Sequence, residues 1–456
     1  MTTLPRAELR RELGLWAAVA IVVGTVIGSG IFLVPKNMVN AVGSPELVFA
    51  VWIFGGVLSL AGALTYAELA AAMPEAGGEY VYLREAYGPL WAFLYGWTQM
   101  WVAKSGSIAT LATAFFLYLS NFFPQLEGTL CVIPLPLGAN GSPLEIRNGQ
   151  LFAMLVIVIL AAINYFGVRF GGGVQVAVTI VKVVLIAALI VIGLTAGVGT
   201  TNNFTSSTAA TGGLSGFFVA LVAVLWAYDG WNNVAMISSE IHEPQKNLPK
   251  ALILGTLGVI VIYLLANVAY FFVLSASEVG KTDRVAAAMM DRVMGTKGAA
   301  AVSLAAMISI FAALNGSILT GARVPFAMSR DGVFFRAVGV VHPKWNTPSV
   351  SILAMSAWAA LLVLSGRYEQ LFTYVIFSSW ILYGMATASV LVLRKKRPDM
   401  HRPYRTLGYP FVPVVFVLVA AALLISTLQA SPRESILGIL IIVAGLPFYA
   451  YWRKRV

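Results

Sequence analysis

Long apolar stretches, separated by short polar segments, run along almost the whole chain of 456 residues. A helix needs roughly 20 mostly apolar residues to cross the hydrocarbon core of a bilayer. Twelve segments fit this description, so the pattern predicts an all-α integral membrane protein with twelve transmembrane helices. The predicted spans are 14–34, 45–73, 90–122, 151–168, 174–196, 214–239, 250–274, 298–321, 348–365, 370–393, 409–428 and 436–452.

The amino-acid composition fits a membrane protein better than a soluble one. Hydrophobic residues make up 59% of the chain and charged residues 11%, whereas soluble domains are typically about 45–50% apolar and about 25% charged. The single cysteine and the three histidines, which all fall between predicted spans, argue against a metal centre or a membrane enzyme. A channel would need a continuous polar stripe along several helices, and only isolated polar positions occur. We therefore expect no enzyme activity, no metal and no cofactor.

The Lys and Arg residues of the loops are distributed unevenly between the two sides of the membrane. With twelve spans, both chain ends share one side with twenty Lys and Arg residues, and the opposite loops hold eight. The positive-inside rule places both termini, including segment 1–13, in the cytoplasm of a multi-pass cell (plasma) membrane protein. This asymmetry also explains the net charge of +11, so the bilayer is the expected partner and nucleic acid is not.

Four charged residues fall inside predicted spans, where each costs on the order of 2.5–3.5 kcal/mol on insertion scales. Lys182 and Asp229 lie in the middle of their spans, which favours a functional role for each. Glu68 lies near the end of a span, so its side chain is equally compatible with the membrane interface. For Lys104, the alternatives to a functional role are a structural ion pair or a long side chain whose ammonium reaches the membrane interface.

Two predicted spans contain helix-weakening residues near the middle of the membrane. Residues 24–32 (GTVIGSGIF) include three glycines, and residues 226–233 (WAYDGWNN) include a glycine beside an aspartate. An interrupted helix frees backbone N–H and C=O groups that need partners. These spans begin two successive groups of five, and interruptions at corresponding places in two halves indicate a transporter site. We expect a first repeat over 14–196, an inverted second repeat over 214–393 and two additional helices over 409–452.

Short motifs spread along the chain resemble those of a known transporter family. They are the run 24–32, Gly230-Trp231-Asn232, Glu240 with Asn247-Leu248-Pro249-Lys250, Ala322-Arg323 with Ser329-Arg330-Asp331-Gly332, and Arg397-Pro398 with His401-Arg402-Pro403-Tyr404. With these motifs the chain resembles the amino acid–polyamine–organocation superfamily. Within it, the chain is similar to the L-type amino acid transporter family, as a bacterial homologue of the light subunits of heteromeric transporters. The resemblance implies a LeuT-like 5+5 inverted repeat with helices 1 and 6 broken, and amino acid transport by alternating access.

The interrupted helices offer the groups that a zwitterionic amino acid needs. A half-helix N-terminus supplies free N–H groups and a positive dipole end, so residues 29–31 are expected to bind the substrate carboxylate. By the resemblance, the carbonyls of Val26, Ile27 and Trp226 accept from the substrate ammonium, and the indole of Trp226 closes over the substrate. The alternative for Trp226 is an aromatic side chain that faces lipid or the core. The predicted substrate-binding residues are Val26, Ile27, Ser29, Gly30, Ile31, Trp226, Asp229, Gly230 and Asn232.

Lys182 bears on the energy source of transport. In sodium-coupled members of the resembled fold a cation bridges spans 1 and 8, and in sodium-independent members a lysine ammonium of span 5 takes its place. Lys182 matches that lysine, and we expect Ser317 to supply its partner hydroxyl in span 8. A fixed charge does not dissociate with the substrate, so the expected function is sodium-independent exchange (antiport) or facilitated diffusion. Proton-coupled symport through Lys182 is the alternative, because buried lysines release their proton more readily.

Asp229 bears on the identity of the substrate. Residues 225–232 (LWAYDGWN) resemble the light subunit that exchanges dibasic for neutral amino acids. The carboxylate of Asp229 would then pair with a cationic substrate side chain. It equally fits a role in holding the unwound helix, or in binding the α-amino group of a neutral substrate. Lys104, in the neighbouring span, would neutralise Asp229 and abolish a cationic preference, so neutral and cationic L-amino acids are both candidate substrates.

Cys131 bears on a partner subunit. Eukaryotic members of the resembled family are linked to a glycoprotein through a cysteine in the loop after span 3, and Cys131 lies in the corresponding region. A lone cysteine is more often incidental, and the strongly basic chain is more typical of a prokaryotic protein. We therefore expect no glycoprotein heavy subunit.

Overall fold

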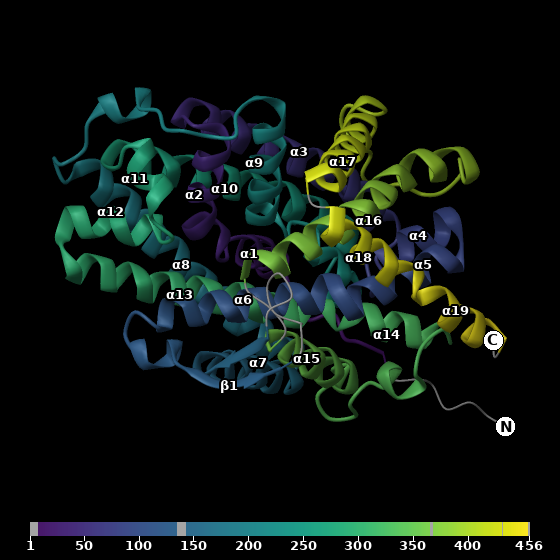
Figure 1. Cartoon of the computed structure of the whole chain (residues 1–456). Helices are drawn as coiled ribbons and strands as arrows, with labels where there is room; N and C mark the ends of the chain where they lie inside the picture. Colours follow the sequence, from purple (N-terminus) through teal and green to yellow (C-terminus); the bar gives the residue numbers. More distant parts are fainter. Residues whose placement is uncertain (1–7, 135–142, 365–367, 431, 455–456) are drawn as a thin grey trace.

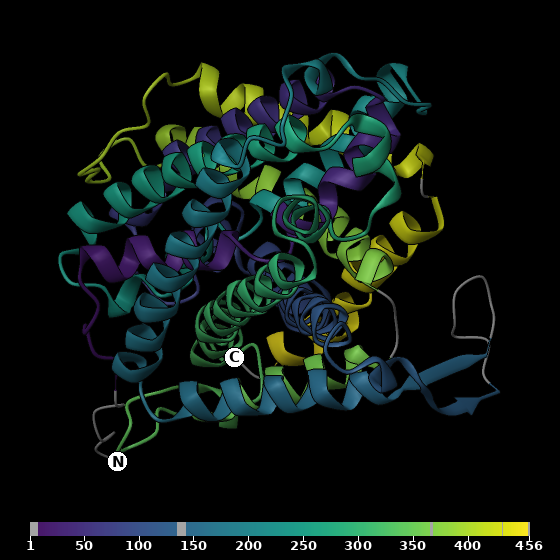
Figure 2. The same cartoon turned by 90° about the vertical axis from the view of Figure 1, so that its left-hand side faces the viewer.

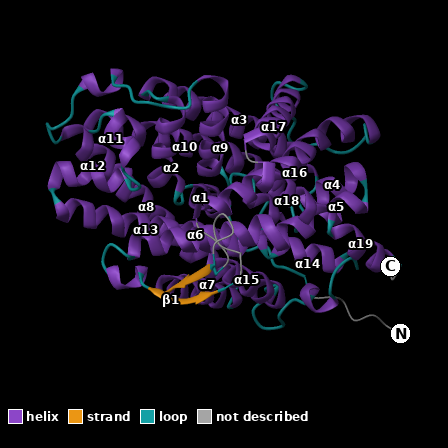
Figure 3. Ribbon diagram, viewed as in Figure 1, coloured by secondary structure: helices purple, strands orange, loops and turns teal. Residues whose placement is uncertain are grey.

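The structure is a computed structural model, and it is helical over most of its length (Figure 3). It describes residues 8–134, 143–364, 368–430 and 432–454, with only the backbone at 368–374, 430 and 434. The helices are α1 (Leu15–Val26), α2 (Gly30–Val42), α3 (Pro45–Ala72), α4 (Glu79–Tyr87), α5 (Pro89–Thr98), α6 (Lys104–Leu119), α7 (Asn148–Tyr165), α8 (Val168–Thr195), α9 (Gly213–Tyr228), α10 (Pro244–Val273), α11 (Ala276–Lys281), α12 (Val285–Met294), α13 (Thr296–Gly321), α14 (Arg323–Arg330), α15 (Ser349–Val363), α16 (Tyr368–Lys396), α17 (Phe411–Ala430), α18 (Pro432–Val443) and α19 (Gly445–Arg453).

One small element departs from the expected all-helical chain. Strands β1 (Thr129–Ile133) and β2 (Leu144–Arg147) form an antiparallel hairpin that projects from the helices (Figure 2). β1 reads TLCVI, and threonine, valine and isoleucine are β-branched residues that favour strands. The hairpin lies between α6 and α7, so it adds a small sheet to a loop of a fold that is otherwise helical, as expected.

Nine helices are long and apolar enough to cross a membrane, or ten with the bent pair α1–α2, within the described ranges. One of the nine, Pro89–Leu119, runs from α5 through a π-helical turn (Gln99–Ala103) into α6. The predicted spans 214–239 and 348–365 overlap the shorter apolar helices α9 and α15. The protein is thus a multi-pass helical membrane protein, and the total of twelve spans stays a prediction.

The first interruption lies between α1 and α2. Val26 ends α1, Gly30 begins α2, and the pair is bent by 41°. Gly30 lets the start of α2 lie directly against α9, because a Cβ at this position would stand 2.4 Å from the Cα of Ala227. A larger residue would have to push the two interrupted spans apart.

The second interruption follows α9. Gly230 has a φ of +105°, which L side chains rarely adopt, so this turn requires glycine. The chain continues through two 3₁₀ turns, Asn233–Met236 and Ser238–Glu240, before α10 begins at Pro244. The two interruptions touch, because the hydroxyl of Thr25 donates to the carbonyl of Gly230 over 3.0 Å.

Helices from the first half of the chain pack against helices from the second half. α3 packs on α10, α6 on α13, α7 on α15 and α2 on α9. Figure 1 shows α11 and α12 at one end of the molecule and α4, α14 and α19 at the other. The basic residues predicted to be cytoplasmic in α4 and α14 therefore lie at the end opposite those predicted to face outside in α11 and α12.

Backbone pairing ties the start of α1 to the segment that follows α9. The N–H groups of Glu12 and Leu13 donate to the carbonyl of Glu240 over 2.9 and 3.0 Å. The carboxylate of Glu240 in turn accepts from Arg323, the first residue of α14, and both side chains are fully buried. Residues 1–7 of the expected cytoplasmic segment 1–13 lie outside the described residues.

Glu68, one of the four charges predicted inside spans, is buried in the protein and is 1% exposed. Its carboxylate accepts from Arg394 over 3.0 and 2.7 Å, and Arg402 lies 3.3 Å away. The N–H and hydroxyl of Thr406 also donate to it, over 2.7 and 2.8 Å. These contacts join α3 to α16 and to the segment after it, which gives Glu68 a structural role.

Candidate functional site

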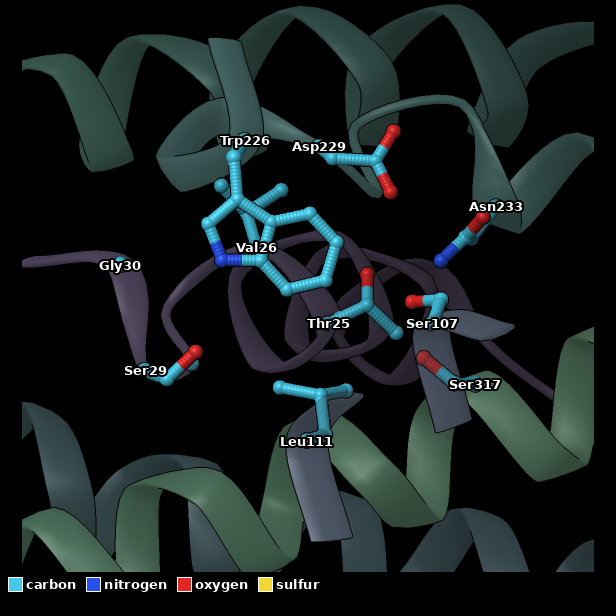
Figure 4. Close-up of a pocket in the computed structure, with 11 residues that line it drawn as sticks. Thr25, Val26, Ser29, Gly30, Ser107, Leu111, Trp226, Asp229, Asn233 and Ser317 are labelled. Carbon is cyan, nitrogen blue, oxygen red and sulfur yellow. The ribbon is translucent and has the colours of Figure 1, made fainter. Parts of the chain in front are cut away.

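A cavity lies where the two interrupted spans meet (Figure 4). It holds about 290 Å³ of empty space, including its open mouth. Its walls come from both interruptions and from α1, α6, α9 and α13. The lining residues are Thr25, Val26, Gly28, Ser29, Gly30, Ser107, Leu111, Trp226, Asp229, Asn233 and Ser317.

The cavity is polar at its two ends and apolar between them. Figure 4 shows Trp226 and Leu111 on opposite sides, so the indole of Trp226 faces the cavity and not the lipid. Ser29 and Gly30 lie at one end, and Asp229 lies at the other. A small molecule with polar groups at both ends matches this division.

The start of α2 supplies the chemistry of the first end. Ser29 is the N-cap residue of α2 and Gly30 is its first residue. A helix start leaves its first N–H groups without partners inside the helix, and the helix dipole adds partial positive charge there. This end is therefore suited to a carboxylate. Of the three residues expected here, Ser29 and Gly30 line the cavity, whereas the side chain of Ile31 packs into the hydrophobic core.

Lys182 of α8 is fully buried and reaches the first interruption. Its ammonium donates to the carbonyls of Gly24 and Ile27 over 2.7 and 2.6 Å, and lies 3.5 Å from the carbonyl of Ser309 in α13. The hydroxyl of Ser309 donates to the same Ile27 carbonyl over 3.0 Å. Ser309, and not the expected Ser317, is thus the α13 residue at this link. Ser317 lines the cavity instead.

Tyr263 of α10 is a buried residue beside the cavity that the sequence pattern did not indicate. Its hydroxyl lies 2.9 Å from the carbonyls of both Val26 and Ala227, at the ends of α1 and α9. Both helices stop at an interruption, and the single hydroxyl proton can satisfy one of these two carbonyls at a time. This tyrosine belongs to none of the motifs found in the sequence. Its hydroxyl, inside an otherwise apolar span, was the only feature that could have indicated a hydrogen-bonding role.

The second end of the cavity holds opposite charges. The carboxylate of Asp229 accepts from the hydroxyl of Tyr383 over 3.0 Å. The ammonium of Lys104 donates to the side-chain oxygen of Asn233 over 2.6 Å and interacts electrostatically with Asp229. Lys104 is therefore placed to offset the charge of Asp229.

Two expected site residues, Gly230 and Asn232, stabilise the second interruption and do not line the cavity. Gly230 makes the turn, and its carbonyl accepts from Thr25. The amide of Asn232 donates to the buried carboxylate of Glu79 in α4, which also accepts from the hydroxyl of Tyr95 over 3.0 Å. Glu79 was missed because it lies between predicted spans, where a charged residue is ordinary.

Glu79 should make the stability of the protein depend on pH. Burial raises the pKa of Glu79 from 4.5 to about 7. The native state therefore binds this proton more tightly than the unfolded chain, and the stabilisation is lost as the pH rises through about 7. We expect the Glu79→Gln variant to gain thermal stability relative to the parent protein as the pH rises from about 5 to about 8.

The measurement is the midpoint of thermal inactivation in detergent, at several pH values. Glu145→Gln, which removes an exposed carboxylate on β2, is the control and should follow the parent protein. Parallel curves for Glu79→Gln and the parent would contradict the role assigned to Glu79.

Interrupted membrane helices that surround a two-ended polar cavity define a class of membrane transport proteins. Among the residues that the structure describes, no group of three or more His, Cys, Asp or Glu side chains lies close enough to hold a metal ion. The chain belongs to the amino acid permease family, whose sequence profile matches residues 13–446.

Relatives of known name cover nearly the whole chain. A serine/threonine exchanger of Bacillus subtilis (strain 168) is 35% identical over 452 residues, covering 98% of each chain. The b(0,+)-type amino acid transporter 1 of Mus musculus is 32% identical, over 98% of this chain and 89% of that protein. The cystine/glutamate transporter of Homo sapiens is 30% identical, over 99% and 87%. The resemblance to L-type transporters is thereby confirmed, and these relatives are transporters and exchangers, not enzymes.

Proposed function

We propose that the protein is a sodium-independent exchanger of neutral L-amino acids that works by alternating access. In the proposed LeuT-like fold, residues 14–196 and 214–393 form two inverted five-helix repeats, followed by two additional helices over 409–452. The packing of α3 on α10, α6 on α13 and α7 on α15 supports this fold, because each pair joins corresponding spans of the two repeats.

The observation that carries the proposal is the fixed ammonium of Lys182 beside the cavity. It already provides positive charge and hydrogen-bond donors to the carbonyls of Gly24 and Ile27 in the first interruption. A transported sodium ion is therefore not needed at this place. Because the charge is covalently attached, it stays behind when the substrate leaves, which leaves exchange or facilitated diffusion without sodium. The serine/threonine exchanger among the relatives favours exchange.

The proposed substrate pose uses both interruptions. The substrate carboxylate binds the hydroxyl of Ser29 and the N–H groups of Gly30 and Ile31 at the start of α2. Lys182 and Ser309 already donate to both lone pairs of the Ile27 carbonyl. The substrate ammonium therefore binds the carbonyls of Val26 and Trp226, where Tyr263 and the N–H of Asp229 leave room for a second donor. The indole of Trp226 then covers the substrate from the side opposite Leu111.

Small neutral side chains fit the second end of the cavity. Ser107 and Ser317 lie there beside Asn233, which gives the substrate side chain polar partners (Figure 4). The serine/threonine exchanger among the relatives supports this substrate class. A cationic side chain paired with Asp229, which the sequence left open, is disfavoured by the nearby ammonium of Lys104.

The proposed setting is the cell membrane, with both termini in the cytoplasm and no heavy subunit. The excess of basic residues at the end that carries α4 and α14 supports this orientation. Cys131, the only cysteine, lies exposed on β1. The proposal that it forms no link to a partner subunit rests on the sequence alone.

Proton-coupled symport is the second candidate function, and Glu79 favours it. This carboxylate has a pKa of about 7, raised by burial, and contacts Asn232 in the second interruption. It is therefore able to take up or release a proton near neutral pH, close to the segment that alternating access would move.

Transport into proteoliposomes distinguishes the two candidates. For an exchanger, labelled serine should enter only vesicles preloaded with unlabelled amino acid, at equal rates in sodium and choline buffers. For a proton symporter, an inward proton gradient should drive uptake into empty vesicles. A steep dependence on sodium would contradict both, and would remove the role given to Lys182.

A further inference from the structure

We infer that Lys104 is a positioning residue that makes the cavity selective for small, uncharged side chains bearing a hydroxyl. This inference rests on the proposed function, since it concerns the same cavity. Lys104 acts through Asn233 and Asp229, which line the cavity, and does not itself contact the substrate.

The ammonium of Lys104 fixes the orientation of the Asn233 amide. An ammonium has three donors and no acceptor, so only the carbonyl oxygen of an amide can face it favourably. The 2.6 Å contact between Lys104 Nζ and Asn233 Oδ1 agrees with this rule. The NH₂ group of Asn233 is consequently turned toward the cavity, and Figure 4 shows its nitrogen on that side.

Tight packing holds this arrangement in place. Lys104 is 3% exposed and Asn233 is 2% exposed, so solvent does not compete for either group. The Lys104 side chain crosses Gly321 of α13, where an added Cβ would lie 2.3 Å from Lys104 Cγ. The ammonium therefore has little freedom to move away from Asn233. A flipped amide would place its NH₂ group against the ammonium, which is unfavourable because both groups are donors.

The same ammonium balances the charge of Asp229. Glu79, the other carboxylate that interacts electrostatically with Lys104, is hydrogen-bonded to Tyr95 and Asn232. The second end of the cavity thus presents a fixed donor from Asn233 and a charge-balanced acceptor from Asp229. A hydroxyl can accept from the first and donate to the second at once, whereas a methyl group can do neither.

Serine and alanine are the matched probes of this inference, since they differ by one hydroxyl. Competition against labelled serine in exchange mode gives the inhibition constants of serine, alanine and arginine for each variant. Lys104→Met keeps the length of the side chain but removes the ammonium. We expect the preference for serine over alanine to fall about three- to tenfold, as for one lost hydrogen bond.

Arginine probes the charge balance independently. Lys104→Met leaves the Asp229 carboxylate without its balancing charge, so arginine should bind at least about tenfold more tightly than to the parent protein. The double variant Lys104→Met/Asp229→Asn should lose this gain. Lys104→Arg keeps a charged donor and should restore most of the parent profile.

Asn233→Asp tests the inference without touching Lys104, and serves if Lys104→Met does not fold. The introduced carboxylate still faces the ammonium, but the donor to the cavity is lost, so the serine preference should fall. An unchanged serine-to-alanine ratio in Asn233→Asp, or equal weakening of all three amino acids in Lys104→Met, would overturn the inference. Failure of the parent protein to exchange serine would instead refute the proposed function.

Discussion

Replacing Lys182 with methionine is expected to lower the exchange rate by about five- to 150-fold. The ammonium is buried and donates to the carbonyls of Gly24 and Ile27, near the carbonyl of Ser309. Methionine fills similar space but offers no donor. The Ile27 carbonyl keeps the hydroxyl of Ser309 as a donor, so the Gly24 carbonyl is the group that loses its partner. A carbonyl left unsatisfied in the interior costs about 1–3 kcal/mol, which corresponds to about a five- to 150-fold change.

The measurement is exchange of labelled serine by reconstituted Lys182→Met, with the amount of folded protein verified by gel filtration. Val181→Met, on the same helix, is the matched control, because that side chain is 46% exposed on the apolar outer surface. It should exchange at the parent rate. Parent-like exchange by Lys182→Met would show that the link from α8 to the first interruption is not required for transport.

The interruptions were predictable because their cause is local. Three glycines in residues 24–32 and the Asp229-Gly230 pair weaken a helix wherever they stand, and the structure has breaks at both places. Lys182 was recognisable for a similar reason, since a charge in mid-span needs partners. Such signals require only the residue itself and its depth in the membrane.

Partners contributed by distant helices were not predictable in the same way. Ser317 was expected beside Lys182, yet Ser309 occupies that place. Eight residues of helix separate the two serines, roughly 12 Å along the axis. The sequence shows that the segment of α13 contains several polar residues. Which of them lies level with Lys182 of α8 depends on how the two helices are shifted along their axes, and packing across the whole molecule sets this shift.

Tyr263 and Glu79 were missed for a related reason. Each supports an interruption from outside: Tyr263 from α10 and Glu79 from α4. Neither belongs to the interrupted helices, and their residue types are common in their surroundings. Their importance arises only when the fold brings them to the free backbone and side-chain groups of the breaks.

Replacing Arg323 with methionine is expected to destabilise the protein by about 3–5 kcal/mol, because it leaves the Glu240 carboxylate buried without its cation. Arg323 Nε and Nη2 donate to the two oxygens of Glu240 over 2.7 and 2.8 Å, and neither side chain is exposed. Glu240 also accepts, through its carbonyl, the N–H groups of Glu12 and Leu13. The loss should therefore loosen the attachment of the N-terminal segment to the chain after α9, as well as α14.

The measurement is denaturant or thermal unfolding of the solubilised protein, with a second arginine as the matched control. Arg292 pairs with Glu278 in the same chain, but their side chains are 43% and 39% exposed. Exposed pairs contribute less than about 1 kcal/mol, so Arg292→Met should be nearly neutral. The double variant Arg323→Met/Glu240→Gln should recover part of the lost stability, because it no longer buries an unpaired charge. Equal effects of Arg323→Met and Arg292→Met would mean that the buried pair does not hold this end of the molecule together.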